Sequence, residues 1–213
     1  MAISLSVAPE VAPLARIGAL TCEVARVAHP DAALDGPMAE AGQVLRAGGE
    51  IDVSAARALY RAIGIDPTRT RPSSEALLRR VRRGEPLPRI NTIVDIGNWC
   101  SVEVQLPYGS YDLDRLVPPI EVRRGRDGEG YAGIRKDVVH LGGRFVVADQ
   151  AGPFGNPTAD SARTMVTTAA RRVLVVVFAP AAVTAFAMTR VLDVTAQRMA
   201  QWAEGRETWR WVS

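Results

Sequence analysis

Hydrophobic positions along the chain follow two spacings, one typical of strands and one typical of helices. Small and β-favouring residues from Leu14 to Val27 predict a strand that ends before His29-Pro30. The run RVLVVVFAP at 172–180 contains continuous valines, which predicts a strand buried on both faces. Shorter strands are predicted for IEVRR at 120–124 and for GRFVVAD at 143–149.

Helical spacing marks several other segments. One helix is predicted near Met38 to Ala47, and another from a Ser54 cap to Gly64, where glycine can take the left-handed conformation. A third amphipathic helix is expected from Thr189 to Glu204. Helices in the first half and strands in the second predict an α+β fold.

The segment RPSSEALLRRVRRGEPLP at 71–88 predicts a short helix over 75–83 that begins at a serine pair and stops at Gly84. Four arginines lie opposite its apolar side and form a cationic face, consisting of Arg79, Arg80, Arg82 and Arg83. This face can contact RNA phosphates, or it can be an ordinary solvated helix surface. The pattern favours neither interpretation.

The segment NTIVDIGNWCSVEVQLP at 91–107 predicts a second amphipathic helix with an unusual polar stripe. Asn91, Asp95 and Asn98 share one face and can present two amides and a carboxylate to a ligand. The alternative makes Asn91 the N-cap and leaves the other two in solvent or local hydrogen bonds, and it is the preferred one. Cys100 lies on the apolar arc, so it is expected to be a small core residue.

Three further segments are predicted to be less regular. YGSYDLDRL after Pro107 is expected to form a turn and one helical turn, with Asp112 and Asp114 pointing to different sides. GPFGNPTADSART at 152–164 is expected to be a loop ending in a polar cluster. The tryptophans are interpreted as packing residues or part of a frayed tail, and they are Trp202, Trp209 and Trp211.

Composition limits the class of protein. The chain has 213 residues, 47% of them hydrophobic, which predicts one domain over 1–213. No apolar run reaches the length of about 18 residues that a membrane span needs, and the N-terminus lacks a basic secretory region, so a soluble cytoplasmic protein is expected. Two cysteines and two histidines without metal spacing predict no metal site, and no motif predicts a cofactor. A net charge of +3 is too small to identify a nucleic-acid binder by itself.

Two stretches resemble a known family. RPSSEALLRRVRRGEPLPRINTIVDIGNWCSVEVQLPYGSYDLDRL and DQAGPFGNPTADSARTMVTT resemble the B3/B4 domain of the phenylalanyl-tRNA synthetase β subunit, in its free-standing version. The resemblance covers about 14–180, leaving the helix at 189–204 outside it. It implies an α+β unit with a β-sandwich of unusual topology and flanking helices. In the synthetase, this domain hydrolyses tyrosine wrongly attached to the phenylalanine tRNA.

The family pattern VDVTNYVxLELGQPxHAFD aligns with VDIGNWCSVEVQLPYGSYD at 94–112. The resemblance places the editing-pocket asparagine on Asn98 and two family aspartates on Asp95 and Asp112. The pocket threonine is replaced by Gly97 and the editing histidine by Gly109. The glycine-rich loop that borders the bound amino acid corresponds to GPFGNPTADS, and a later glutamate is replaced near Val176 and Val177.

The expected site follows from these matches. The residues expected to position water or substrate are Asn98, Asp112 and Asn91. The expected substrate-binding residues are Asp95, Gly97, Gly109, Gly152, Gly155, Asp160 and Arg163. Arg163 can hold a phosphate or organise Asp160 and Asp149, and the alternative is a buried ion pair. The four arginines of the cationic face are the expected RNA contacts.

Two functions therefore compete. The first is a trans-editing enzyme that deacylates a mischarged tRNA, with a tyrosyl-type ester on tRNA(Phe) as substrate. The second is a non-catalytic module that binds RNA, an amino acid or a related small molecule, favoured by the loss of the histidine at Gly109. The adenylation motifs of a complete tRNA ligase are missing from the sequence, so tRNA charging is not expected. The oligomeric state stays open.

Overall fold

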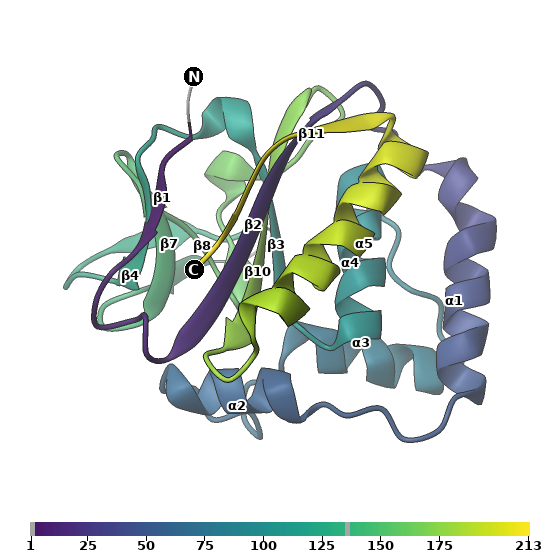
Figure 1. Ribbon diagram of the computed structural model, residues 1–213, viewed down its shortest axis with the longest axis horizontal. Helices are drawn as coiled ribbons and strands as arrows, with labels where there is room; N and C mark the ends of the chain where they lie inside the picture. The colour runs from purple at the N-terminus through teal and green to yellow at the C-terminus, as the bar shows by residue number, and fades with distance from the viewer. Residues whose placement is uncertain (1–2, 135–136) are drawn as a thin grey trace.

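The structure is a computed structural model that describes residues 3–134 and 137–213. Two larger β-sheets face each other, and helices cover the outer face of one of them (Figure 1). Within the described residues, no helix combines the length and hydrophobicity needed to cross a membrane. The mixed α+β class expected from the sequence is confirmed.

The central sheet has four antiparallel strands in the order β11-β2-β10-β3. They are β2 (Ala15–Val24), β3 (Tyr108–Asp112), β10 (Arg172–Pro180) and β11 (Gly205–Val212). The strands predicted at 14–27 and 172–180 are confirmed. In β10, Val173, Val175 and Val177 belong to the core under the helices, whereas Leu174, Val176 and Phe178 belong to the core between the sheets. β10 therefore takes part in both cores.

The second sheet has five strands in the order β1-β4-β7-β8-β9, of which only β1 and β4 pair in parallel. They are β1 (Leu5–Val7), β4 (Ile120–Arg124), β7 (Phe145–Asp149), β8 (Gly152–Asn156) and β9 (Ala159–Asp160). A separate hairpin pairs β5 (Gly130–Ala132) with β6 (Val138–His140). The strands predicted at 120–124 and 143–149 are confirmed by β4 and β7.

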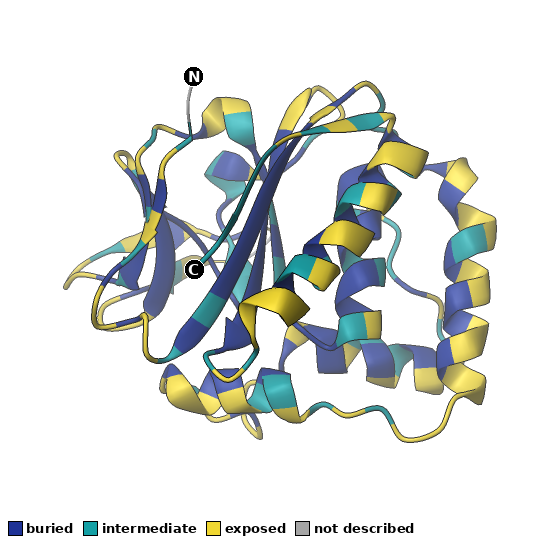
Figure 2. Ribbon diagram, in the orientation of Figure 1, coloured by how far each residue is buried: buried dark blue, intermediate teal, exposed yellow. Residues whose placement is uncertain are grey.

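Five α-helices lie in the described residues, together with three short 3-10 turns. The helices are α1 (Asp35–Ala47), α2 (Ser54–Ala62), α3 (Ser73–Arg82), α4 (Thr92–Val104) and α5 (Ala185–Ala203). The turns are η1 (Ala32–Leu34), η2 (Leu113–Arg115) and η3 (Ala162–Thr164). Figure 2 shows the exposed residues of α5 on its outward side, while α4 behind it is almost entirely buried or intermediate, and both helices contribute to the core on the central sheet. All helices predicted from periodicity are present, and α5 begins four residues before the predicted start.

Two predicted caps are wrong. Ser54 is the first residue of α2, and its backbone N–H and hydroxyl both donate to Asp52, so Asp52, two residues before the helix, fixes the turn. The serine pair at the start of α3 makes no capping hydrogen bond, because Ser74 is buried inside the first turn. Gly64 follows α2 in the left-handed region, as predicted, and Gly84, predicted to stop α3, takes the same conformation.

Three segments predicted to be irregular are strands. The segment after Pro107 forms β3 because it pairs with β10, and only η2 after it is helical. The segment at 152–164 forms the β8–β9 hairpin and η3 rather than a loop. The chain after α5 pairs with β2 as β11, and Trp209 and Trp211 pack against the core between the sheets. The packing interpretation of the tryptophans is thus confirmed and the frayed tail is wrong.

Candidate functional site

Tyr111 lies at the centre of the region where the resemblance places the amino-acid pocket. It is on β3, fully buried, and its phenol passes between Gly109 on the same strand and Gly155 on β8. A Cβ atom on either glycine would lie 2.1 Å from the Tyr111 hydroxyl oxygen, a distance at which one of the groups must move. The Phe154 ring meets the phenol edge to face, with centroids 4.8 Å apart. The two glycines are therefore required by the position of Tyr111.

The Tyr111 hydroxyl is held by a carboxylate. It donates a hydrogen bond of 2.7 Å to Asp160 Oδ1 at the end of the β8–β9 hairpin. Burial, and then the negative charge of Asp160, raise the pKa of Tyr111 well above its ordinary value. The phenol consequently stays protonated and acts as a donor. The structure brings together three of the expected substrate-binding residues, Gly109, Gly155 and Asp160. The phenol of Tyr111 fills the space between them.

The polar stripe of α4 is used mainly for structure. Asn91 is the N-cap, since its Oδ1 accepts from the Val94 N–H at 3.1 Å while its Nδ2 donates to the Val166 carbonyl. Asp95 is fully buried and accepts from Arg89 Nε at 2.9 Å and from the Ile90 N–H at 2.7 Å. The N-cap alternative for Asn91 is confirmed. Asn98 is half-buried, and its side chain makes no hydrogen bond with the described residues.

The remaining predicted positions fall on two faces of the central sheet. Gly97 of α4 faces Ser110, whose Oγ would lie 3.2 Å from a Cβ at 97. Ser110 and Asp112 alternate with Gly109 and Tyr111 along β3, so Asp112 points to the helix side. There it accepts from the Asp114 N–H and pairs with Arg115 at 3.3 Å. The structure therefore separates Asn98, Gly97 and Asp112 from the group around Tyr111.

Arg163 forms the ion pair that was one of its two interpretations. Its guanidinium binds both oxygens of Asp149, at 3.0 and 2.9 Å, and donates to the Gly152 carbonyl at 3.3 Å. Asp149 also accepts from the N–H groups of Val117 and Ala151. Arg163 thus holds the turn between β7 and β8, with its charge directed at Asp149.

The four arginines of the cationic face, three in α3 and Arg83 just after it, each make an internal contact. Arg79 pairs with Glu75 at 3.1 Å, Arg82 donates to the Gly49 carbonyl, and both Arg80 and Arg83 pair with Glu85. Glu75 is buried and also accepts two bonds of 2.8 Å from Arg57 of α2. The hydrogen bonds from Arg57 lower the pKa of Glu75 despite its burial.

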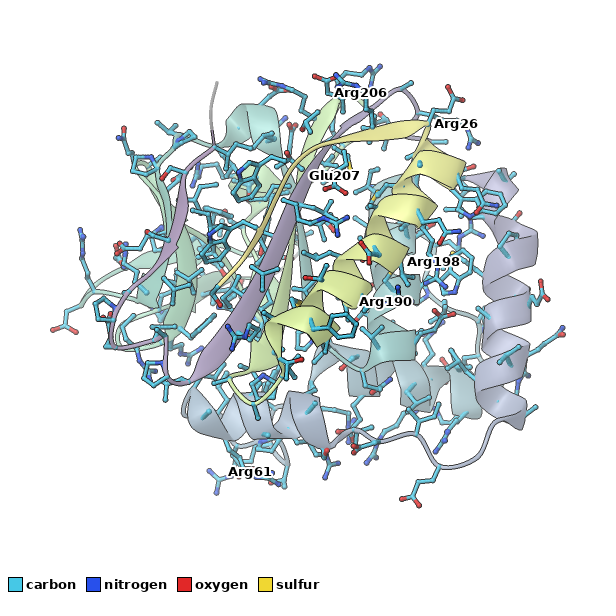
Figure 3. All side chains as sticks on the ribbon, viewed as in Figure 1. Arg26, Arg61, Arg190, Arg198, Arg206 and Glu207 are labelled. Carbon is cyan, nitrogen blue, oxygen red and sulfur yellow. The ribbon has the colours of Figure 1, made fainter. Side chains whose placement is uncertain are left out.

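These contacts leave a large positive surplus. Residues 54–83 contain eight arginines and two carboxylates, Asp66 and Glu75, and Glu85 just after them pairs with two of these arginines, whereas the whole chain has a net charge of +3. α2 and α3 lie along the same edge of the molecule, at the bottom of Figure 1. Figure 3 shows Arg61 extending outward from this edge. We call α2, α3 and their connection, residues 54–83, the basic edge.

The fold defines the class of protein first. A crystal structure of an N-terminal fragment of the phenylalanyl-tRNA synthetase β subunit from Pyrococcus horikoshii matches 100% of this chain and 55% of that chain, with a TM-score of 0.53 and 13% identity. The α+β architecture is therefore that of a phenylalanyl-tRNA synthetase β-subunit fragment. Residues 55–199 match the family model of the B3/4 domain, and the chain belongs to this family.

Relatives of known name agree with the family. The phenylalanine–tRNA ligase β subunit of Xanthomonas campestris pv. campestris strain 8004 is 36% identical over 88 residues, which are 41% of this chain. That of Neisseria meningitidis serogroup B is 36% identical over 64 residues, or 30% of this chain. The matched parts span 11% and 8% of those two proteins, so this chain corresponds to a small part of each.

Proposed function

We propose that this protein binds tRNA through the basic edge and interacts with the aminoacylated end of that tRNA. The observation that carries the proposal is the concentration of eight arginines against two carboxylates on α2, α3 and their connection. Cationic side chains gathered on one edge bind RNA phosphates and release condensed counterions. Membership in the B3/4 domain family, whose relatives are tRNA ligase subunits, supports tRNA as the RNA concerned.

Hydrolysis of a mischarged aminoacyl-tRNA is the second candidate. It is favoured by Asn98, which is half-buried and has a free amide beside Gly97, and by the gathering of Gly109, Gly155 and Asp160 around one point. Ester hydrolysis needs room for an attacking water and donors for the developing oxyanion. The phenol of Tyr111 takes up that room between the two glycines. Binding without turnover is therefore the function that the geometry supports best.

The binding proposal is tested by titrating labelled tRNA(Phe) with the protein at several salt concentrations. We expect the affinity to fall with salt by about 0.7–0.9 power of the concentration for each phosphate contacted. The double variant Arg82→Glu/Arg83→Glu should weaken binding at least tenfold. The matched control is Arg190→Glu/Arg126→Glu, which has the same charge change at exposed positions outside the basic edge. Equal loss in both variants would contradict a specific role for the basic edge.

The hydrolysis candidate needs a separate assay. The protein is mixed with tyrosyl-tRNA(Phe), and with phenylalanyl-tRNA(Phe) as the control ester, at catalytic and at stoichiometric concentrations. Binding alone predicts protection of the ester or no effect. Multiple turnovers on the tyrosyl ester, reduced by Asn98→Ala, would instead establish a trans-editing enzyme and displace the binding-only conclusion.

A further inference from the structure

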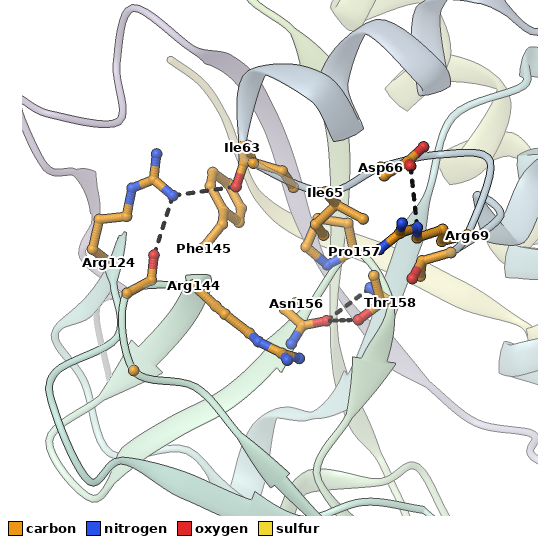
Figure 4. Close-up of a pocket in the computed structure, with 14 residues that line it drawn as sticks. Ile63, Ile65, Asp66, Arg69, Arg124, Arg144, Phe145, Asn156, Pro157 and Thr158 are labelled. Carbon is orange, nitrogen blue, oxygen red and sulfur yellow. Dashed lines mark hydrogen bonds and ion pairs between the residues drawn. The ribbon is translucent and has the colours of Figure 1, made fainter.

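A hollow of about 430 Å³ lies beside the C-terminal end of α2, away from Asn98 and Asp112. Its walls come from the chain after α2, from the start of β7 and from the turn between β8 and β9 (Figure 4). The basic side chains in its lining are Arg69, Arg124 and Arg144, and the one carboxylate in the lining is Asp66. We call this hollow the α2 cleft. Its lining has a surplus of two positive charges.

Asn156 is the polar side chain most firmly fixed in the α2 cleft. It is 6% exposed, and its Oδ1 accepts three hydrogen bonds, from the Thr158 N–H at 2.8 Å, the Thr158 hydroxyl at 2.7 Å and the Ala159 N–H at 2.9 Å. Because the oxygen is committed to this turn, the orientation of the amide is determined. Its Nδ2 has no hydrogen-bond acceptor among the described residues, and Figure 4 shows it directed into the cleft on the side of Arg144.

The three arginines have unequal freedom. Arg124 donates from Nη1 to the Ile63 and Gly143 carbonyls, both at 3.2 Å, which anchors it in the wall without a carboxylate partner among the described residues. The Arg144 side chain is exposed and makes neither a hydrogen bond nor an ion pair with any part of the chain that the structure describes. Arg69 lies 3.7 Å from Asp66, whose carboxylate already accepts from the Thr68 N–H and hydroxyl. Most of the positive charge is thus available to a ligand.

We propose that the α2 cleft is a phosphate-binding site in which the Arg144 guanidinium and Asn156 Nδ2 donate to the phosphate oxygens. Arg124 and Arg69 add positive charge to the walls. A phosphate fits this set of donors: a phosphate monoester carries about −1.5 to −2 charge at neutral pH and three strong acceptor oxygens, and an RNA phosphodiester carries one negative charge and two free acceptor oxygens. Arg69 belongs to both the basic edge and the cleft, so the two surfaces are continuous.

The source of the phosphate follows from that continuity. The inference rests on the proposed function in one respect, since it assigns the phosphate to a tRNA lying on the basic edge. A free phosphate monoester, such as a nucleotide, has the same chemistry and is the other source. The experiment therefore uses both tRNA(Phe) and small phosphates as probes.

Two variants remove the proposed donors with little change in shape. Asn156→Asp keeps an oxygen that accepts the three turn hydrogen bonds, but it replaces the Nδ2 donor by a negatively charged oxygen. Arg144→Gln removes one charge at an exposed position where folding does not depend on the side chain. Arg190→Gln on α5 is the matched control, exposed and far from the cleft in sequence. Thermal melts of all three establish that they are folded.

The protein is then titrated with tRNA(Phe), and separately with inorganic phosphate and with AMP while amide NMR shifts are recorded. We expect Asn156→Asp and Arg144→Gln to weaken tRNA binding at least fivefold, with the salt slope lowered by about 0.7–0.9 in Arg144→Gln. Both variants should also abolish phosphate-induced shifts of the Asn156 and Arg144 amides, and Arg190→Gln should match the wild type.

The other outcomes separate the two proposals. If the two variants lose the phosphate-induced shifts but bind tRNA as tightly as the wild type, the phosphate site stands and tRNA as the source of the phosphate is overturned. Wild-type protein that binds AMP in the cleft but no tRNA would overturn the proposed function and leave the site standing. Unchanged tRNA affinity together with no phosphate-induced shift in the wild type would overturn the site itself.

Discussion

The interior around Tyr111 and the basic edge differ in what they leave open. In the interior, the Tyr111 phenol fills the room between Gly109 and Gly155. Its hydroxyl donates to Asp160, so this polar group is satisfied within the protein. On the basic edge, positive charge exceeds negative charge and several guanidinium groups face solvent. The comparison teaches that one domain can fill one region with its own side chains while positive charge stays available on another. Stability should therefore depend on the first region and RNA affinity on the second.

The largest effect on stability is expected from removing the buried side chain of Tyr111. Tyr111→Ala removes a fully buried aromatic side chain and should lower the free energy of unfolding by about 3–5 kcal/mol. Tyr111→Phe loses only the hydrogen bond to Asp160 and should cost about 1–2 kcal/mol. Urea unfolding followed by circular dichroism measures both. If Tyr111→Ala also weakened tRNA binding in protein shown to be folded, RNA affinity would not depend on the basic edge alone and the contrast between the two regions would be contradicted.

A smaller effect on stability is expected from adding a side-chain atom next to the Tyr111 phenol. Gly155→Ala puts a Cβ 2.1 Å from the Tyr111 hydroxyl oxygen and should cost about 2–3 kcal/mol. In a Tyr111→Ala background the same substitution should be almost free, so a double-mutant cycle measures the coupling. Gly36→Ala is the matched control because a Cβ there meets nothing within 4 Å. Additive costs in the cycle would show that Gly155 is needed for another reason.

The smallest effect on stability is expected at the basic edge. Glu75→Gln keeps the shape of a buried side chain but weakens its bonds to Arg57 and Arg79, and should cost about 1–2 kcal/mol at neutral pH. The pKa of Glu75 is lowered below 4.5 in the folded protein, so its contribution is complete above that pH and is lost as the pH falls through the folded pKa. The difference in unfolding free energy between wild type and variant should therefore shrink as the pH falls below 4.5. A difference that persists at the acid end would contradict this assignment.

Hydrophobic periodicity predicts those elements whose own residues decide their structure. β2, β10 and α4 are examples, since their apolar spacing matches the surfaces they bury. β3 was missed because Gly109, Ser110 and Asp112 have low strand preference, and its conformation comes from pairing with β10. β8 was missed for a related reason: glycine and proline favour a loop, but Gly155 is there to admit the ring of Tyr111. Tertiary contacts override local preference in both strands.

The candidate site shows the same limit. The sequence indicated the N-cap role of Asn91 because capping is local, and it offered the ion pair of Arg163 only as an alternative because Asp149 lies far along the chain. It did not single out Tyr111 or Asn156. The pattern Gly109-x-Tyr111 on one strand was the available signal for the first, since a small residue two positions from an aromatic gives it room to fold back. The importance of Asn156 depends on which amide atom accepts the hydrogen bonds of the turn, and this follows from the three-dimensional structure and not from the sequence.

The continuous valines of β10 affect how the strand finds its pairing register with the neighbouring strands. In most strands a slip by one residue exposes apolar groups and buries polar ones, so the error is corrected by the hydrophobic effect. From Val173 to Val177 both sets of side chains are apolar, and such a slip changes little in polarity. Alignment must instead be set at the ends, by the ion pair of Arg172 with Asp114 and by the edge-to-face contact of Phe178 with Phe145. The register of β10 is thus set by contacts at the two ends of the strand. The apolar residues between these ends are compatible with more than one register.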